Sequence, residues 1–199
     1  MNPGGASGQT GAIILARHGK PALSRRTLLS SQDYSTWWAS YEVGGLGPEQ
    51  VTPDALTLAA RDAGAIVAST RLRSVESARA AGRGKTFTSD PLFVEAPLPP
   101  PRWPGWIRLP PIVWGFISRV SWWFLDQHHG EESRRQAEAR ADAAAARLTE
   151  LAAAGRDVLV LAHGFFNAMI ARALRRQGWR CTVDGGWKYW AARRFEKRR

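Results

Sequence analysis

Four short apolar runs, separated by helix-like segments, constrain the fold of this chain more than any other feature. Turn signals or charged residues bound each run, and such continuous runs are typical of strands covered on both faces of a sheet. The runs lie at residues 12–16, 65–69, 86–88 and 157–162. Helical patterns lie between and after them, at 52–64, 71–82, 131–154 and 165–178. This alternation predicts an α/β fold, a three-layer sandwich around a mostly parallel central sheet.

Local start and stop signals set the expected helix ends. Thr52 is a candidate N-cap, and Pro53 would then take the first helical position. Three glycines follow the last periodic residues of their segments and are expected to end the helices, namely Gly64, Gly82 and Gly155.

Two regions break the alternation. Residues 20–50 mix serine, glycine and aromatic side chains, and we expect them to form a long excursion from the loop after the first strand. Residues 96–128 are rich in proline and tryptophan and form an insertion. The length of 199 residues favours a single domain over 12–192, with a disordered lead-in at 1–11 and a solvated basic tail at 193–199.

Composition narrows the partners and the compartment. The chain has 28 Lys and Arg against 17 Asp and Glu, a net charge of +11, which favours an anionic partner. Cys181 is the only cysteine, which excludes an internal disulfide and a cysteine-based zinc cluster and favours a reducing, cytoplasmic location. The N-terminal residues lack the features of a secretory signal. We expect no transmembrane segment, because the apolar stretch at 109–118 has about half the necessary length.

Histidine and arginine side chains follow three of the predicted strands. Arg17 and His18 follow the first strand, Arg73 follows the second, and His163 follows the fourth and precedes a helix. Because the carboxyl ends of parallel strands share one edge of a sheet, these side chains are expected to converge there. Arginine binds phosphate oxygens bidentately, a neutral imidazole nitrogen can attack phosphorus, and a helix N-terminus favours anions. The pattern predicts a pocket for a doubly charged anion.

These motifs resemble the histidine phosphatase superfamily, also called phosphoglycerate mutase-like. The family signature Arg-His-Gly after the first strand is present at 17–19. The family's Ser-x-x-x-Arg element is similar to Ser69 through Arg73, and its strand ending in His-Gly is similar to "VLVLAHG" at 158–164. The Gly-Glu-Ser element of many members resembles "GEES" at 130–133.

The resemblance implies a role for each matching residue. His18 would be the nucleophile that becomes phosphohistidine, and Arg17, Arg73 and His163 would hold the phosphoryl oxygens. Glu95, in a stretch similar to the family's "E-A-x-L-P", would be the proton donor. The rivals for this acid are Asp90 and Glu76. Further phosphate contacts would come from the backbone of Gly164 and from Ser24, which stands where many members have asparagine.

Three other groups of residues have interpretations that do not depend on catalysis. Arg71 is expected to face solvent, because the family position falls on Arg73. His128 and His129 could belong to a metal site, but we favour a polar loop that caps the following helix. The tryptophans of the insertion are interpreted as lid and core, with a peripheral membrane element or a dimer interface as alternatives. They are Trp103, Trp106, Trp114, Trp122 and Trp123.

The resemblance implies an enzyme that hydrolyses a phosphomonoester without a metal or another cofactor. Its substrate would be a phosphorylated small molecule or a phosphoprotein, and a phosphomutase is a variant of the same chemistry. The alternative class is a weak or inactive phosphate-binding scaffold that docks to a membrane or a partner. The departures from the family pattern at Lys20 and Ser24 support that alternative. No nucleic-acid partner is expected, because no recognised module is present.

Overall fold

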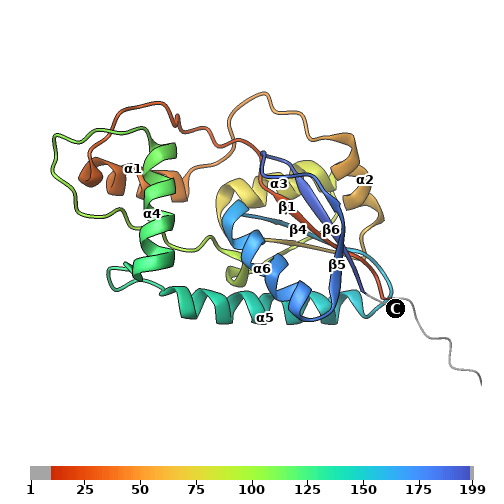
Figure 1. Ribbon diagram of the computed structural model, residues 1–199. Helices are drawn as coiled ribbons and strands as arrows, with labels where there is room; N and C mark the ends of the chain where they lie inside the picture. Colours follow the sequence, from red (N-terminus) through yellow and green to blue (C-terminus); the bar gives the residue numbers. More distant parts are fainter. Residues whose placement is uncertain (1–9, 198–199) are drawn as a thin grey trace, which may run out of the picture.

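The computed structural model describes residues 10–197, which form a six-stranded sheet between two layers of helices (Figure 1). The strand order is β3-β2-β4-β1-β6-β5, in which the first four strands are parallel and the last two are antiparallel additions. The strands are β1 (Ile13–Arg17), β2 (Ala65–Ala68), β3 (Thr88–Ser89), β4 (Val158–Ala162), β5 (Trp179–Asp184) and β6 (Ala192–Lys197). The predicted α/β class with a mostly parallel sheet is confirmed.

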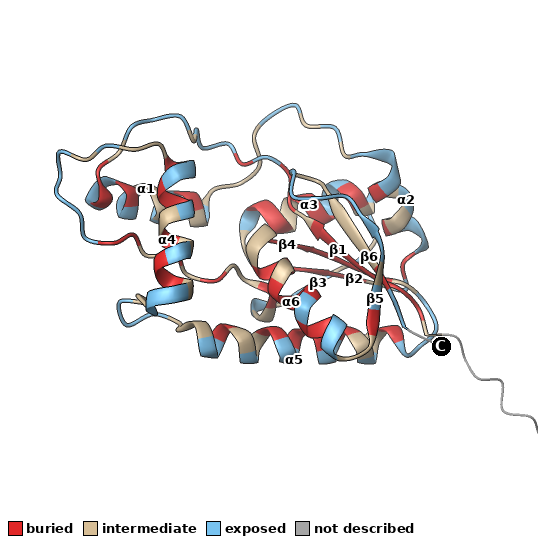
Figure 2. Cartoon of the chain, in the orientation of Figure 1, coloured by how far each residue is buried: buried red, intermediate tan, exposed pale blue. Residues whose placement is uncertain are grey.

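Each face of the sheet packs against a pair of helices. Ile13 and Leu15 of β1 point into a core formed with α5 (Arg134–Ala152) and α6 (Gly164–Arg176). Ile14 and Ala16 point the other way, into a core formed with α2 (Asp54–Asp62) and α3 (Leu72–Gly82). Figure 2 shows the buried residues along the strands and on the helix sides that face them. This two-sided burial explains why the strand sequences are continuously apolar.

Helix α5 packs closely because its buried face is almost entirely alanine. The buried residues are Ala137, Ala141, Ala144, Ala145, Leu148 and Ala152, at helical spacing. Ser133 caps the N-terminus, and the Gln136 side chain returns a hydrogen bond in a capping box. The helix therefore begins at Arg134, later than the predicted 131, and Gly155 follows it with a φ of +80°.

Two local predictions were wrong in detail. Pro53 is the N-cap of α2, not its first helical residue, and no side chain caps this helix, so Thr52 has no capping role. The third strand lies at Thr88–Ser89 and not at 86–88, because Thr88 pairs with Val67. Phe87 instead packs against the core on the α2 and α3 side.

Both regions that break the sequence pattern contain a helix. These are α1 (Ser31–Val43), with a capping box between Ser30 and Asp33, and α4 (Pro111–Leu125). The two helices pack against each other beyond the carboxyl ends of the parallel strands (Figure 1). The Trp114 Nε1 group of α4 donates a hydrogen bond of 2.7 Å to the Leu29 carbonyl. A short 3₁₀ helix, η1 (Pro91–Phe93), precedes the loop that leads toward α4.

The predicted basic tail at 193–199 is wrong for its described part, which is β6. This strand pairs antiparallel with β1, and Phe195 opposite Ile13 is fully buried. Arg193 and Arg194 are compatible with a strand because each forms an ion pair with a carboxylate. Arg193 lies 2.8 Å from Asp184, and Arg194 lies 2.7 Å from Asp157.

The predicted lead-in at 1–11 lies mostly outside the described residues. Gly11 is described, and it is packed instead of disordered. Its N–H donates to the Ala152 carbonyl at 2.9 Å, and a side chain at this position would collide with the Arg156 backbone. Within residues 10–197, no helix is long and apolar enough to cross a membrane.

Candidate active site

The strand register brings the predicted histidines and arginine to one edge of the sheet. Arg17 at the end of β1 pairs with Ala162 at the end of β4, and β2 ends beside β4, with Ala68 opposite Leu161. The residues just beyond these strand ends therefore converge. The rings of His18 and His163 are 5.2 Å apart, and the Arg73 side chain reaches both of them.

His18 is held in one tautomer, with the proton on Nδ1. Its Nδ1 lies 2.7 Å from the Gly19 carbonyl oxygen, which can only accept, so Nδ1 carries the proton. The lone pair is then on Nε2, which faces Arg73 Nε at 3.3 Å. Burial, and secondly the Arg73 charge, hold the pKa of His18 well below its usual value. The ring is neutral at physiological pH.

Gly19 and the loop after it are fixed by the helix that carries Arg73. The Gly19 N–H donates to the Ser77 hydroxyl at 2.9 Å, and that hydroxyl donates to the Arg73 carbonyl at 2.6 Å. A side chain at position 19 would collide with the Trp190 ring. The small residue of the Arg-His-Gly motif thus lets the loop close against Trp190.

Arg73 is the hub of the cluster, and its side chain is 1% exposed. Its Nε and Nη2 groups point at His18 Nε2 and His163 Nδ1, each at 3.3 Å. Its Nη1 donates to the carbonyls of Tyr41 and Glu42, at 2.8 and 3.1 Å. The guanidinium is therefore fixed in place between the two histidines.

His163 adopts the opposite tautomer. Arg73 can only donate, so His163 Nδ1 accepts, and His163 Nε2 donates to the Ser69 hydroxyl at 2.8 Å. Burial, and after it the charge of Arg73, lowers the pKa of His163 well below its usual value. Ser69, the first residue of the Ser-x-x-x-Arg element, thus orients His163. The sequence analysis had not assigned this role to Ser69.

Arg17 packs against an aromatic ring and a glycine. Its guanidinium carbon lies 4.2 Å from the Tyr189 ring centroid, and its Nη1 donates to the Trp187 carbonyl at 2.6 Å. A side chain on Gly164 would lie 3.3 Å from Arg17 Cδ and Nε, which explains the glycine at the start of α6. The Arg17 Nε group is buried and has no hydrogen-bond partner among the described residues.

Glu95, the predicted acid, sits at the N-terminus of α6. Its Oε1 accepts from the Phe166 N–H at 2.8 Å, and its Oε2 accepts from the Phe165 N–H at 3.4 Å. Burial is the main influence on the Glu95 carboxyl and raises its pKa, while the Arg119 charge and the Phe166 hydrogen bond act against this. A carboxyl with a raised pKa is suited to donate a proton.

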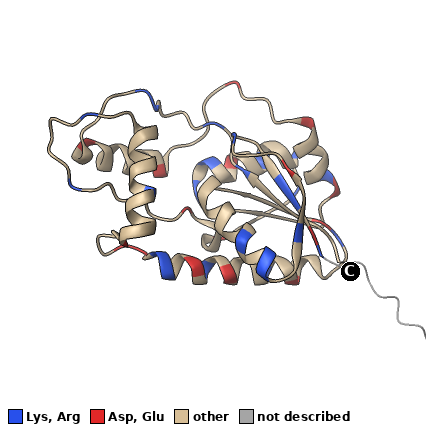
Figure 3. Cartoon of the chain, viewed as in Figure 1, with Lys and Arg blue, Asp and Glu red and all other residues tan. Residues whose placement is uncertain are grey.

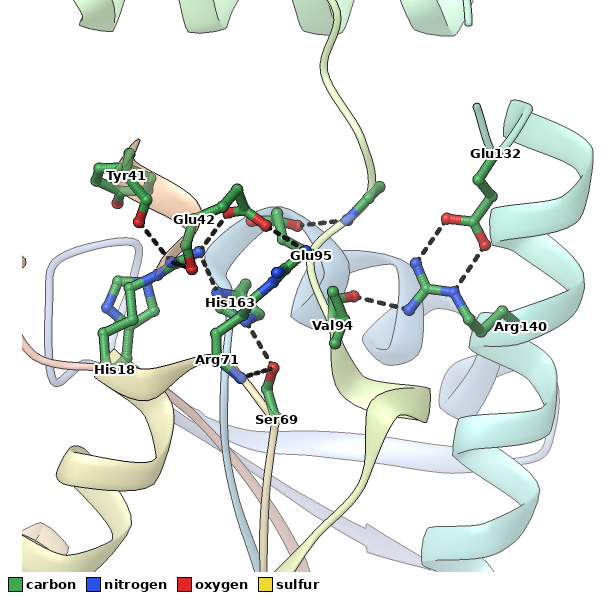
Figure 4. A network of polar contacts seen from close by, with 12 residues as sticks. His18, Tyr41, Glu42, Ser69, Arg71, Val94, Glu95, Glu132, Arg140 and His163 are labelled. Carbon is green, nitrogen blue, oxygen red and sulfur yellow. Dashed lines mark hydrogen bonds and ion pairs between the residues drawn. The ribbon is translucent and has the colours of Figure 1, made fainter. Parts of the chain in front are cut away.

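Arg140 clamps the chain just before Glu95. Its Nη1 donates to the carbonyls of Leu92 and Val94 at 3.0 and 2.7 Å, and its Nε and Nη2 bind Glu132 in a bidentate pair at 2.7 Å each (Figure 4). Its guanidinium also covers the Phe166 ring at 3.8 Å. Glu132 of the "GEES" element therefore supports the segment before Glu95, the predicted acid, through Arg140.

Glu42, at the end of α1, was missed by sequence reasoning. Its carboxylate lies 2.7 Å from Arg73 Nη2 and 2.7 Å from Arg71 Nη2, and its side chain is 13% exposed. Arg71, which was expected to face solvent, is 35% exposed, and this ion pair also draws it toward the cluster. Figure 4 shows the Arg71 side chain extending toward Glu42. No local signal in α1 marks Glu42, since its role depends on tertiary placement against Arg73.

Other candidate residues are engaged elsewhere. Ser24 lies in an exposed loop, where its hydroxyl accepts from the Arg26 N–H, and no recorded contact in residues 10–197 joins it to the cluster. The two alternative acids accept hydrogen bonds from backbone N–H groups. Asp90 caps η1 through the Leu92 N–H, and Glu76 accepts from the Leu46 N–H. The N-cap of α5 is Ser133, so the capping of α5 does not come from His128 or His129.

Two cavities flank the cluster. The larger, of about 1080 Å³, is bordered by Glu42, Arg71 and Glu95 and by the proline-rich stretch at 97–101, Trp38 and Trp103. The smaller, of about 620 Å³, is bordered by Arg17 and Tyr189. Trp114 and Trp122 of the insertion are buried, as the interpretation of a core role predicts. Trp103 and Trp106 are exposed. A lid function for this segment stays a prediction.

Solved structures of similar fold include phosphatases and a mutase. A mycobacterial glucosyl-3-phosphoglycerate phosphatase in complex with vanadate aligns with a TM-score of 0.52 and 21% identity, covering 83% of this chain and 82% of that chain. A phosphoglycerate mutase from Bacillus anthracis str. Sterne aligns with a TM-score of 0.54 and 16% identity, covering 95% and 90%. A phosphoserine phosphatase variant from Entamoeba histolytica, bound to phosphoserine, aligns with a TM-score of 0.54 and 13% identity, covering 83% of this chain and 80% of that chain. At these identities the likeness shows the fold.

The family follows from the sequence itself. No curated protein matches the chain. The model of the histidine phosphatase superfamily, branch 1, matches residues 13–183, a span that contains all three strand-end motifs. The chain therefore belongs to branch 1 of the histidine phosphatase superfamily.

Proposed function

We propose that this protein hydrolyses phosphomonoesters through a phosphohistidine on His18. The observation that carries the proposal is the buried His18 ring, neutral and protonated at Nδ1, with its Nε2 lone pair directed into the Arg73–His163 cluster. Family membership and the phosphatases among the structural neighbours support the reaction type. The substrate is a phosphorylated small molecule or a phosphoprotein.

In the first step, His18 Nε2 attacks phosphorus and the bond between phosphorus and the leaving oxygen breaks. The electron pair of that bond goes to the leaving oxygen, which takes the proton of the Glu95 carboxyl. Positive charge develops on the imidazole ring, and the Gly19 carbonyl at Nδ1 stabilises it. Arg17, Arg73 and His163 stabilise the phosphoryl oxygens, and this is why the proposed reaction uses no metal.

In the second step, water attacks the phosphohistidine and Glu95, now a carboxylate, accepts the water proton. The bond between phosphorus and Nε2 breaks, its electron pair returns to the ring, and phosphate leaves with His18 again neutral. Because Glu95 borders the cavity of about 1080 Å³, the leaving group is placed there, beside proline and tryptophan side chains.

The test is turnover of p-nitrophenyl phosphate by the purified protein with a chelator present. Hydrolysis that is lost in His18→Ala, together with a phosphate bound to His18 in acid-quenched peptides, is the expected result. An absence of turnover, or turnover that His18→Ala retains, would contradict the proposal. Transfer of the phosphoryl group to a second hydroxyl in place of water would reveal a mutase.

A second candidate function is favoured by the surface of α4. Ile112, Phe116, Val120 and Phe124 follow each other at helical spacing and are exposed, and α4 carries a single charge, Arg119 (Figure 3). We propose that this stripe, together with the exposed Trp106, docks to an anionic membrane surface, to which the net charge of +11 is complementary. Flotation with anionic vesicles at low salt tests it: binding lost in Phe116→Ser with Phe124→Ser is expected, and no binding by the unmodified protein would refute it.

A further inference from the structure

The larger cavity, of about 1080 Å³, has aromatic and proline side chains on its border beside Glu95. Trp38 of α1 and Trp103 border it, together with four prolines of one short segment. A leaving group that takes its proton from Glu95 enters this space. The four prolines are Pro97, Pro99, Pro100 and Pro101, and they are called the proline segment below.

Most arginines on this border are already paired with carboxylates. Arg71 lies 2.7 Å from Glu42, and Arg140 lies 2.7 Å from Glu132 (Figure 4). In the part of the chain that the structure describes, Arg102 is the one border arginine without a carboxylate within 4.0 Å, and it is exposed. The border therefore offers little unpaired positive charge to an anionic leaving group.

The proline segment also lacks hydrogen-bond donors at its four prolines. Proline has no backbone N–H, so each of these residues has only a carbonyl acceptor and an apolar ring. A carboxylate or a phosphate needs donors, and its burial without them is costly. An uncharged leaving group with an apolar face fits this segment better than an anion does.

The Trp38 ring is fixed relative to the histidine cluster. It stacks on the Tyr41 ring, with the centroids 5.3 Å apart and an angle of 21° between the planes. The Tyr41 ring in turn lies 4.7 Å from the guanidinium carbon of Arg73. A continuous stack of side chains therefore connects the proposed phosphate site to the border of the larger cavity.

Trp103 is held in place by two contacts. Its carbonyl accepts a hydrogen bond of 3.1 Å from the Ser31 hydroxyl, and its ring meets the buried Trp114 ring edge to face, with the centroids 5.5 Å apart. Trp103 is nevertheless 41% exposed. A fixed indole with a free surface can stack on a ligand ring with little loss of side-chain entropy.

We infer that the leaving group of the substrate is an uncharged alcohol that carries a flat ring, and that Trp38 and Trp103 determine this specificity. The ring lies against the two indoles and the proline segment, while the oxygen that is bonded to phosphorus faces Glu95. The inference rests on the proposed function, because it takes the phosphate to lie at His18.

The test compares the binding of four phosphonates by isothermal titration calorimetry, which needs no turnover. The probes are methylphosphonate, benzylphosphonate, 4-carboxybenzylphosphonate and 4-(aminomethyl)benzylphosphonate, in which carbon replaces the ester oxygen. The unmodified protein is expected to bind benzylphosphonate about 10- to 100-fold more tightly than methylphosphonate, because one ring leaves water. Both charged probes are expected to bind more weakly than benzylphosphonate.

Substitutions then test the two tryptophans. Trp38→Leu and Trp103→Leu remove the flat ring but keep an apolar side chain, and each is expected to lower the ratio of the benzylphosphonate and methylphosphonate affinities about 3- to 10-fold. The affinity for methylphosphonate should stay the same. Trp106→Leu is the matched control, because Trp106 lies three residues from Trp103, is 81% exposed and does not border the cavity.

Three results would overturn the inference. They are a ratio close to one in the unmodified protein, tighter binding of either charged probe than of benzylphosphonate, and a ratio that Trp38→Leu and Trp103→Leu change no more than Trp106→Leu does. The order of the four probes tests the leaving-group class without any substitution. An absence of p-nitrophenyl phosphate hydrolysis removes the proposed function, while this order still decides what the cavity binds.

Discussion

Replacing Glu42 by glutamine is expected to tighten phosphate binding. The Glu42 carboxylate engages Arg73 Nη2 at 2.7 Å, and that group is one of those assigned to the phosphoryl oxygens. A phosphate must therefore displace Glu42 or share the guanidinium with it. Glutamine keeps an oxygen acceptor for Arg73 but removes the negative charge that competes with the phosphate.

The magnitude follows from the type of bond that is weakened. Hydrogen bonds to charged groups contribute about 1.5–3 kcal/mol, whereas neutral ones contribute about 0.5–1.5 kcal/mol. Solvent screens this pair little, because the Arg73 and Glu42 side chains are 1% and 13% exposed. The difference of about 1–1.5 kcal/mol corresponds to a roughly tenfold lower Kd for phosphate. The free energy of unfolding should fall by about the same amount, since the Tyr41 and Glu42 carbonyls still hold Arg73.

Titration of inorganic phosphate into the unmodified protein and Glu42→Gln measures this difference, and urea unfolding measures the stability. Glu138→Gln is the control, because Glu138 pairs with Arg134 on the exposed side of α5 and loses the same charge. Unchanged or weaker phosphate binding in Glu42→Gln would mean that Glu42 orients Arg73 for the phosphate, and the competition argument would then be wrong.

Three further results are expected. Stability should fall as the pH drops below about 6.5, because the pKa values of buried His18 and His163 are lowered and the unfolded chain therefore binds more protons, at about 1.4 kcal/mol per pH unit for each histidine. Urea midpoints at pH 7 and 5.5 measure this, and a pH slope that His163→Gln leaves unchanged would contradict it. Arg140→Lys should lower kcat about 10- to 100-fold for an alkyl phosphate, because Arg140 holds the segment before Glu95. The loss of kcat should be smaller for p-nitrophenyl phosphate, whose leaving group needs no proton from Glu95. Equal losses on both substrates would rule out a positioning role for Arg140. Phe195→Ala should lower the free energy of unfolding by about 3–5 kcal/mol in urea titrations, because it empties a fully buried site, and a loss below about 1 kcal/mol would mean that β6 is peripheral.

The sequence alone predicted the strands and the grouping of the site residues where local patterns and sheet geometry agree. β1, β2 and β4 are continuously apolar and buried on both faces, so their positions were predicted to within a residue or two. The rule that ligands bind at the carboxyl ends of parallel strands then placed His18, Arg73 and His163 together without any structure. Their contacts confirm this placement.

The rest depends on contacts between distant segments. β6 was read as a solvated tail because Phe195 is surrounded by arginines, and only Asp157 and Asp184, far away in the sequence, neutralise them. Helix α4 has large apolar residues on its exposed side as well as on its buried side, so the sequence does not show the separation of apolar and polar residues that marks a surface helix. Glu42 acquires a role only when α1 is placed against Arg73, and no pattern within α1 predicts that position.

The place of β1 in the sheet determines when the active site can form during synthesis. β1 directly precedes His18, the proposed nucleophile, and is synthesised before both its neighbours in the sheet, β4 and β6, which come from residues 158–197. Until those residues emerge, β1 is an apolar strand with two open edges, the kind of segment that associates with other chains. Until residue 197 has been synthesised, the strand before His18 therefore lacks its neighbours, and expression should depend on how well chaperones cover that strand.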